Sequence, residues 1–280
     1  MSSLSDITND IHISNPELWT LSLGVSNAGI RLFMYNDKEA DSMVCRNIAI
    51  GKSVTSDADY LKAIEDAVYD NPLLLNAFKK VSILAETPHF LFLPPGYGDD
   101  EAVGHLFSKT FPEDCGDVVM SRGNACGADV AFSLRKGLHR FLLRTFDNPS
   151  VRLNLEILSS HFIGKNNYST VNKEYVYIHD GKVDVCVFKR GKLQLANTFV
   201  FRYPNDAIYY ILGVWNMFSF DPISDEIQIA GDKEVKDEIV PVLRDYVTYV
   251  LPVIMPPAAM KLGNDVVKAP LDLILLSLCE

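Results

Sequence analysis

Residues 175–188 read YVYIHDGKVDVCVF, in which two runs of alternating apolar residues lie on either side of Asp180-Gly181. An Asp-Gly pair between two such runs is a strong signal of a β-hairpin, because both central residues of the favoured turn need positive φ. The turn also fixes which residues face each other across the two strands. The sequence therefore predicts an antiparallel hairpin with Asp180 and Gly181 at its tip.

This hairpin opens a longer unit. A second tight turn, Arg190-Gly191, leads into a third predicted strand over residues 193–203. Asn205 is of a residue type that caps helices, and apolar side chains recur after it at helical spacing. They are Ile208, Ile211, Leu212 and Trp215. A short apolar run at 227–229 then predicts a further strand, which gives the order strand, strand, strand, helix, strand.

An earlier part of the chain repeats this order. Residues 19–35, WTLSLGVSNAGIRLFMY, contain two strand-like runs around a Ser/Asn/Gly turn, and a third run covers residues 43–50. Ser56 and Asp59 form a capping-box-like helix start, and residues 81–84 predict the strand after that helix. The two units align through Leu21 with Val176, Pro72 with Pro222, and Val81 with Ile227. The pattern favours one duplicated unit; chance recurrence of a common β-meander followed by a helix is the alternative.

The segment between the two units contains the most basic part of the chain. Short predicted strands at 117–121 and 128–132 precede a predicted helix that starts at Ser133. The helix carries what we call the basic stripe, which consists of Arg135, Lys136, His139, Arg140 and Arg144. Such a stripe is most simply the solvated face of an amphipathic helix. A docking surface for an acidic partner or for RNA is the alternative interpretation.

Composition narrows the classes of protein. The chain has 280 residues, 48% of them hydrophobic, which is enough for a large buried core. Its 36 acidic and 26 basic residues give a formal net charge of −10, which disfavours nucleic acid as a partner. Residues 1–10 lack both basic residues and an apolar run, and no apolar stretch reaches the roughly 20 residues of a transmembrane helix. We therefore expect a cytoplasmic protein without a membrane-spanning segment.

The cysteines and histidines give no pattern typical of a disulfide framework or a metal site. The cysteines are odd in number and include no C-x-x-C pair: Cys45, Cys115, Cys126, Cys186 and Cys279. None of the 6 histidines has a spacing typical of metal ligands. We expect reduced thiols, no metal ion and no cofactor.

The two strand–turn–strand units resemble the phosphate-binding hairpins of the actin-like ATPase fold. That fold is a duplicated ribonuclease-H-like architecture shared by actin, sugar kinases, FtsA and the pilus-assembly protein PilM. Residues 195–201 with residues 205–212 also resemble a bacterial domain-of-unknown-function family found in Bacteroidetes, whose members are thought to adopt this fold. The resemblance implies an α/β protein with mixed sheets and two lobes, residues 1–172 and residues 173–280.

The resemblance also locates the functional positions of the fold. Active members have Asp-x-Gly in each hairpin, and these carboxylates organise Mg²⁺ and water beside the nucleotide phosphates. The corresponding triplets here are Ser22-Leu23-Gly24 and Tyr177-Ile178-His179, and the Gly-Gly pair beside adenosine becomes Ala230-Gly231. A hydroxyl cannot replace a charged oxygen ligand of Mg²⁺, and phosphoryl transfer depends on positioned charge and metal. The resemblance thus implies a degenerate nucleotide site formed by Ser22, Gly24, Tyr177, Asp180, Gly181, Lys182 and Gly231.

These substitutions predict a pseudo-ATPase. We expect no ATP hydrolysis, weak or absent nucleotide binding, and a role as an interaction module for an unidentified protein partner. The alternative is a nucleotide-binding switch or an enzyme that uses non-standard groups, Asp180, Asp184 and Lys182, in the cleft between the lobes. Convergence of those three groups in a deep cleft would favour the enzyme, whereas a cleft filled by Tyr177 and His179 would favour the binding module.

Overall fold

The computed structural model describes residues 13–39, 42–51, 56–123, 125–166 and 169–278. Residues 1–10, on which the expectation of no signal peptide depends, and Cys279 lie outside the described residues. In the described part of the chain the strands form two five-stranded sheets and one three-stranded sheet. The helices lie against these sheets, so the chain is an α/β protein, as predicted.

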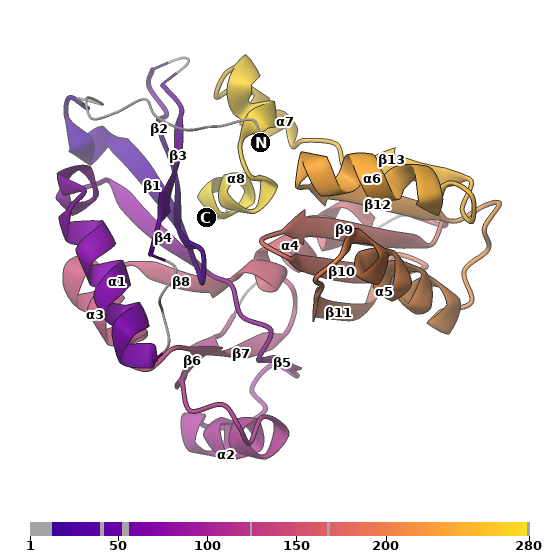
Figure 1. Cartoon of the computed structure of the whole chain (residues 1–280), viewed down its shortest axis with the longest axis horizontal. Coiled ribbons are helices and arrows are strands. Elements are labelled where there is room, and N and C mark those ends of the chain that lie inside the picture. The colour runs from indigo at the N-terminus through magenta and orange to yellow at the C-terminus, as the bar shows by residue number, and fades with distance from the viewer. Residues whose placement is uncertain (1–12, 40–41, 52–55, 124, 167–168, 279–280) are drawn as a thin grey trace.

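The first five-stranded sheet comes from the N-terminal part of the chain (Figure 1). Its strand order is β3 (Val44–Ala49), β2 (Gly29–Asn36), β1 (Trp19–Ser26), β4 (Lys80–Ala85) and β8 (Ser150–Leu153). Strands β1 and β3 are antiparallel to β2, whereas β4 is parallel to both β1 and β8. The sheet is therefore mixed, as the resemblance implied.

The second five-stranded sheet repeats this topology. Its order is β11 (Lys192–Val200), β10 (Lys182–Lys189), β9 (Lys173–His179), β12 (Glu226–Gly231) and β13 (Tyr249–Pro252). Again the first three strands are antiparallel and the next two are parallel to the central strand. The repeated order and directions are those expected of the duplicated unit.

The predicted hairpin is present, with Asp180 (φ 43°) and Gly181 (φ 68°) in its turn. In the two hairpins Ser26 pairs with Gly29 and His179 pairs with Lys182, so Ser26 and His179 are equivalent. This moves the alignment of the hairpins by two residues, because Leu21 then corresponds to Glu174 and not to Val176. The alignment of Val81 with Ile227 is unchanged, since Val81 pairs with Leu21 and Ile227 pairs with Glu174.

A smaller unit is inserted between β4 and β8. Its three strands, in the order β5 (Phe90–Leu93), β7 (Asp129–Leu134) and β6 (Asp117–Ser121), are antiparallel. Helix α2 (Asp100–Thr110) packs on this sheet through Val103 and Phe107, which form a separate apolar cluster with Leu93 and Ala131. The sequence predicted strands at 117–121 and 128–132, and the apolar run 90–93 also reads as a strand, but their separation into a sheet of their own was not predicted.

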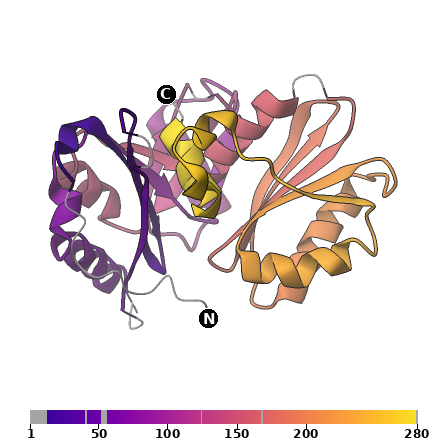
Figure 2. The ribbon, with the colours of Figure 1, turned by 90° about the horizontal axis from the view of Figure 1, so that it is seen from above.

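The helices form three layers around the two large sheets (Figure 2). Helix α1 (Asp57–Tyr69) covers the outer face of the first sheet, and α5 (Pro204–Met217) with α6 (Lys233–Leu243) covers the outer face of the second. Helices α4 (Asn154–Asn166) and α8 (Leu271–Leu278) pack together between the sheets. The first seven residues of α8 are all buried, as expected of a helix surrounded by protein.

Four short helical segments complete the described structure: η1 (Pro16–Leu18), η2 (Pro72–Leu75), α7 (Pro257–Met260) and η3 (Asn264–Lys268). No helix among the described residues is long and apolar enough to cross a membrane. Helix α8 comes from the end of the chain but packs on β1, β2 and β4. The lobe boundary between residues 172 and 173 stays a prediction.

Two predicted helix starts were wrong. The helix expected from Ser133 is α3 (Leu138–Thr145), because β7 continues to Leu134 and Gly137 then takes positive φ (83°). Helix α5 begins at Pro204, so Asn205 lies in its first turn and does not cap it. Proline suits this first position, where its missing N–H would have no helical partner. The predicted cap at Ser56 is confirmed, since its Oγ accepts the backbone N–H of Asp59.

Candidate functional site

Charged side chains from both large sheets and from α8 meet in the middle of the molecule. Each large sheet contributes residues from its hairpin or from the carboxyl end of a neighbouring parallel strand, which is where sites commonly form in α/β proteins. We call these residues the central ion cluster: Arg31, Glu86, Tyr177, His179, Asp180, Lys182, Asp184 and Asp272. Most of these side chains are buried, so their charges are shielded from water and need partners within the protein.

Arg31 on β2 joins the first sheet to α8. Its guanidinium contacts Glu86 at 2.5 Å and Asp272 at 2.5 Å, and both carboxylate side chains are 0% exposed. A second pair of hydrogen bonds, Nε to Glu86 Oε1 and Nη1 to Asp272 Oδ1, makes the contacts fork-like. Such geometry suits arginine, which presents several donors in a rigid plane.

Asp272 receives a further hydrogen bond across the molecule. The hydroxyl of Tyr177 on β9 donates to Asp272 Oδ1 at 2.8 Å. Burial, together with the negative charge of Asp272, raises the pKa of Tyr177 well above its usual value, so the hydroxyl keeps its proton and remains a donor. Through Asp272, Arg31 of the first sheet and Tyr177 of the second sheet bind the same carboxylate.

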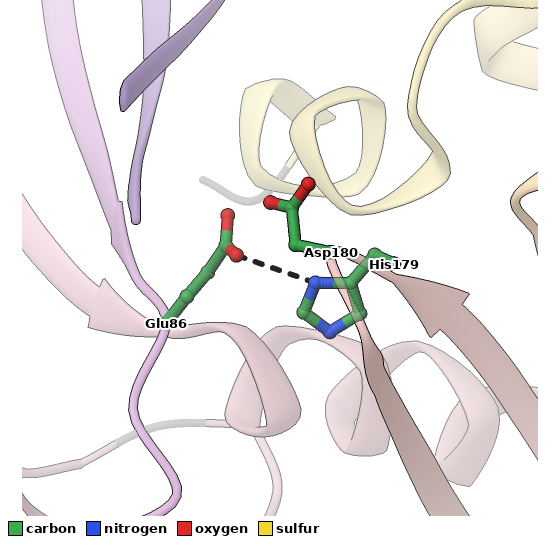
Figure 3. Close-up of side chains that lie close together, drawn as sticks. All are labelled: Glu86, His179 and Asp180. Carbon is green, nitrogen blue, oxygen red and sulfur yellow. Dashed lines mark ion pairs between the residues drawn. The ribbon is translucent and has the colours of Figure 1, made fainter. Parts of the chain in front are cut away.

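His179, at the end of β9, lies between two carboxylates. Its Nε2 is 2.9 Å from Asp184 Oδ2, and its Nδ1 is 3.3 Å from Glu86 Oε2, as an ion-pair contact (Figure 3). Burial opposes the charged ring, but Asp184 and Glu86 outweigh it and raise the pKa of His179 to about 10. His179 is therefore an imidazolium near neutral pH, and both of its ring N–H groups face carboxylates.

The carboxylates of Asp184 and Glu86 have further partners besides His179. Asp184 accepts hydrogen bonds from the Asn154 amide at 2.6 Å and from the Thr198 hydroxyl at 2.6 Å. Lys182 Nζ lies 3.3 Å from Glu86 Oε2. Burial alone would raise the pKa of Glu86, but Arg31, His179 and Lys182 hold it well below its ordinary value. Glu86 is therefore a stable carboxylate at the centre of the cluster.

The cluster leaves almost no free space. The hollow beside Glu86, His179, Lys182 and Asp184 measures about 10 Å³. That is close to the smallest cavity that holds one water molecule, and far below the several hundred Å³ typical of a small-ligand pocket. The rings of Tyr177 and His179 stack with their centroids 5.1 Å apart, and His179 also lines the hollow. Asp184 and Lys182 both line this hollow, which is too small to be the deep cleft that the enzyme alternative requires.

The arrangement does not fit a metal ion. Glu86, His179 and Asp180 each place a possible ligand atom within 4.8 Å of the others (Figure 3). However, Arg31 and Lys182 already contact these carboxylates, and His179 is protonated on both nitrogens, so it has no lone pair for a metal. The cationic groups of the chain occupy the place that a divalent cation would need.

The structure brings three of the seven predicted site residues into the cluster, namely Tyr177, Asp180 and Lys182. Gly24 adjoins it: a Cβ there would lie 3.3 Å from both Arg31 Nη2 and Glu86 Oε1, so the missing side chain leaves room for this ion pair. Gly181 belongs to the hairpin turn.

The other two predicted residues have different settings. Ser22 is buried in β1, and its Oγ has no hydrogen-bond partner among the described residues. Gly231 has φ 103°, and a Cβ there would lie 1.9 Å from the carbonyl oxygen of Ile178. Gly231 therefore permits two neighbouring backbones to approach, which is a sufficient structural reason for a glycine. A role of the seven residues in nucleotide binding stays a prediction.

Sequence reasoning missed Arg31, Glu86 and Asp272, the residues that join the parts of the cluster. Arg31 pairs with Glu86 and Asp272, which lie 55 and 241 positions further along the chain. Two weak signals were available. Arg31 interrupts a strand of apolar residues, and Asp272 is the only charged residue in the apolar run LDLILLSL of α8. Charges in such places are buried and need partners.

The basic stripe does not form a continuous charged surface. Arg135 contacts Asp57 at 3.4 Å and lies 4.6 Å above the ring of Tyr60, and Arg144 contacts Glu65 at 3.6 Å. All three partners belong to α1, so part of the stripe holds α3 against α1. This weakens the alternative of an RNA-binding surface, since such surfaces need basic groups available to phosphates.

Comparison with solved structures defines the fold. A protein of unknown function from Bacteroides thetaiotaomicron with an actin-like ATPase fold superposes with a TM-score of 0.77, at 20% sequence identity, over 97% of this chain and 100% of that one. The PilM-PilN type IV pilus biogenesis complex gives a TM-score of 0.50 at 11% identity, over 94% of this chain and 97% of that one. The chain thus has the actin-like ATPase fold.

The family is also defined. The model of the family described as "Protein of unknown function (DUF3822)" matches residues 8–250, and the chain belongs to this family. No curated protein matches the sequence significantly. The expected resemblance to a domain-of-unknown-function family with an actin-like fold is confirmed.

Proposed function

We propose that this protein is a non-catalytic member of the actin-like ATPase fold, a pseudo-ATPase that acts by binding another protein. The observation that carries the proposal is the central ion cluster, which fills the junction between the two sheets and leaves a hollow of about 10 Å³. Both hairpins lack the Asp-x-Gly triplet of active members. The first has Ser22-Leu23-Gly24, and the register of the strands makes Tyr175-Val176-Tyr177 its equivalent in the second, two residues before the triplet Tyr177-Ile178-His179 aligned from sequence.

The energetics of the cluster support this proposal. Entry of a nucleotide between the sheets would separate Arg31 from Glu86 or Asp272, whose side chains are 0% exposed. Leaving one member of a buried ion pair without its partner costs about 3–5 kcal/mol. Because 1.4 kcal/mol corresponds to a factor of ten, that cost weakens nucleotide affinity by roughly 10² to 10³ or more. The phosphates would also meet the carboxylates of Glu86 and Asp184 without a metal ion between them.

A role in protein binding fits the relatives of known structure. PilM, which shares the fold, was solved in a complex with PilN in type IV pilus biogenesis. We extend only the mode of action to this chain, namely that the fold presents surfaces to another protein. We also propose that the protein works in the cytoplasm, because Cys45, Cys115 and Cys186 form no disulfide, and burial raises the pKa of Cys45 to about 11 and that of Cys186 to about 12.

A phosphate-release assay distinguishes this proposal from the rival nucleotide switch or enzyme. The full chain is incubated with ATP and Mg²⁺ beside the variant Lys182→Met, which removes the cation that the rival mechanism would use on phosphate. We expect both proteins to release phosphate at the background rate. Release above background by the wild type that is lost in Lys182→Met would overturn the proposal and support the enzyme.

A further inference from the structure

A second hollow in the described structure lies away from the central ion cluster. It measures about 400 Å³ and is formed by β6, α3, β8 and the start of α2. Its apolar lining includes Val118 and Leu143, whose side chains are 39% and 48% exposed. A volume of several hundred Å³ is in the range of ligand sites, and apolar residues that remain exposed around it point to an unfilled contact.

The backbone of β6 faces this hollow. Three consecutive residues of the strand, Val118, Val119 and Met120, line it. Successive side chains of a strand point to opposite faces of a sheet, so a hollow can touch three in a row only at the edge of the strand. Strand β6 is indeed the last strand of its sheet, since β7 is its single neighbour in the order β5-β7-β6.

The edge of β6 is not covered by another described segment. The described backbone hydrogen bonds of β6 run to β7, and none joins its outer edge to a turn or loop. Strand β8, on the opposite side of the hollow, is likewise the last strand of the first sheet. Edge strands carry rows of unpaired N–H and C=O groups that can accept an added strand.

One other edge shows how this protein can block such pairing. In the second sheet, β13 is also an edge strand, but the guanidinium of Arg244 binds the carbonyl of Val250, and Pro252 has no N–H. Proline and charged groups at an edge are common protections against strand addition. No proline lies in β6 (Asp117–Ser121), and no side chain of a described residue caps its backbone.

The charge beside the hollow indicates the chemistry of the occupant. His139 and Leu143 of α3 line the hollow, and Lys136 and Arg140 lie next to them on the same segment. Neither Lys136 nor Arg140 makes an ion pair with a described residue. Asp100 on the opposite rim is already paired with Arg122, and burial lowers the pKa of His139. Asp117 of β6 acts on His139, and Asp147 lies beyond the end of the helix, so the charge here is mixed. Arg140 is the cation of α3 that remains available to an acidic group of a ligand.

We propose that β6 binds an extended peptide of a partner protein as an added β-strand, with apolar side chains in the hollow and an acidic side chain beside Arg140. We call this site the β6 groove, and it is formed by Val118, Val119, Met120, His139, Leu143 and Val151. Strand β6 has 5 residues, so the bound segment is of similar length. This inference rests on the proposed function as a protein-interaction module and assigns it a surface and a partner chemistry.

A phage-displayed library of random peptides of about twelve residues, selected on the full-length chain, tests the proposal. We expect the enriched peptides to alternate apolar and other residues and to contain an acidic side chain. The variant Leu143→Arg places a charge in the β6 groove and should weaken their binding at least about tenfold. The matched control is Val267→Arg, which changes a valine that is 59% exposed on a different segment and should leave binding unchanged.

Two measurements separate strand addition from other contacts. N-methylation of alternate amides in the selected peptide should abolish binding, because it removes the backbone donors of an added strand. Hydrogen exchange at residues 117–121 should slow when the peptide binds. Arg140→Glu should weaken the acidic peptides several-fold, and less at high salt.

Several results would overturn the assignment. Failure to enrich any peptide would do so, as would peptides that bind Leu143→Arg as tightly as the wild type. The second result would leave the interaction function standing and move it to another surface. Formation of a dimer that Leu143→Arg dissociates would replace the peptide with a second copy of the chain. ATP turnover would instead contradict the proposed function itself.

Discussion

Removal of the Arg31 side chain tests whether the central ion cluster holds the two sheets together. Arg31→Met keeps most of the volume but leaves Glu86 and Asp272 without their shared cation, and both carboxylates are 0% exposed. At the effective dielectric constant of about 20 that describes such sites, a charge pair about 4 Å apart is worth roughly 4 kcal/mol. Removal of one partner of a buried pair costs about 3–5 kcal/mol in measured cases.

We expect Arg31→Met to lower the free energy of unfolding by about 4–5 kcal/mol. The value lies near the upper limit because Asp272 loses its cation and keeps the neutral hydroxyl of Tyr177 as a side-chain donor. Glu86 is less affected, since Lys182 and His179 stay nearby. That is a large fraction of the roughly 5–15 kcal/mol that stabilises a typical domain. Urea unfolding followed by circular dichroism measures the change, as a shift of the midpoint at constant slope.

Two further variants make this measurement interpretable. Lys79→Met removes a cation from an ion pair with Asp37 in which both side chains are 50% exposed, so it should leave the unfolding midpoint nearly unchanged. Adding Asp272→Asn to Arg31→Met removes one uncompensated charge and should restore part of the loss. A loss below about 1 kcal/mol for Arg31→Met, or strictly additive effects in the double variant, would refute the reasoning.

Three other predictions follow from buried groups and backbone contacts. The pKa of His179 is raised to about 10, so the charged ring contributes on the order of 3–5 kcal/mol to the free energy of unfolding. This contribution is complete below the unfolded pKa of about 6.5 and is lost as pH rises toward 10. His179→Gln should flatten that part of a stability–pH profile. Burial without a hydrogen-bond partner raises the pKa of Glu174, so the free energy of unfolding should fall as pH rises above about 4.5. Glu174→Met should raise stability at pH 7 by about 1–3 kcal/mol, measured by calorimetric melting. Gly231→Ala should lower the free energy of unfolding by more than about 3 kcal/mol, because the added Cβ would meet the backbone of Ile178. Gly213 lies in α5, where an added Cβ would meet no neighbouring segment within 4 Å, so Gly213→Ala should stabilise the fold by up to about 1 kcal/mol in urea unfolding.

The local features of the fold were predictable because their signals are short in sequence. Asp180-Gly181 gives the hairpin since positive φ is needed at adjacent residues, and Ser56 gives the start of α1 since its Oγ reaches the N–H three residues on. The repeated strand order of the two large sheets followed from hairpins and helices in the same sequence order. The shift of two residues in the hairpin alignment was not predictable, because apolar alternation reads equally well after a shift by two.

The central ion cluster could not be assembled from sequence, since its members are brought together only by the packing of α8 between the sheets. Arg31 and Asp272 are 241 positions apart, and no local pattern states that they share a hydrogen bond. Helix α8 itself was not predicted, because a short apolar run at a chain end fits a strand or a helix. Sequence reasoning considered carboxylates only at the two hairpin triplets, whereas the cluster is built on Glu86 and Asp272, which both pair with Arg31.

The sequence also gave no indication of the β6 groove. Strand β6 was predicted but β8 was not. A groove also depends on which strands end a sheet, and the separate three-stranded sheet was not foreseen. His139 and Leu143 were assigned to a helix that was expected to begin at Ser133. Its actual start at Leu138, after the positive φ of Gly137, sets which side chains of α3 face β6.

Calorimetric titration of the full chain with ATP and Mg²⁺ tests most directly whether the central ion cluster closes the nucleotide site. Arg31, His179 and Lys182 already pair with the carboxylates of Glu86, Asp184 and Asp272, and the hollow beside them measures about 10 Å³. The account predicts no measurable heat of binding at micromolar to high-micromolar nucleotide and no turnover. Saturable binding with micromolar affinity, accompanied by hydrolysis, would contradict it.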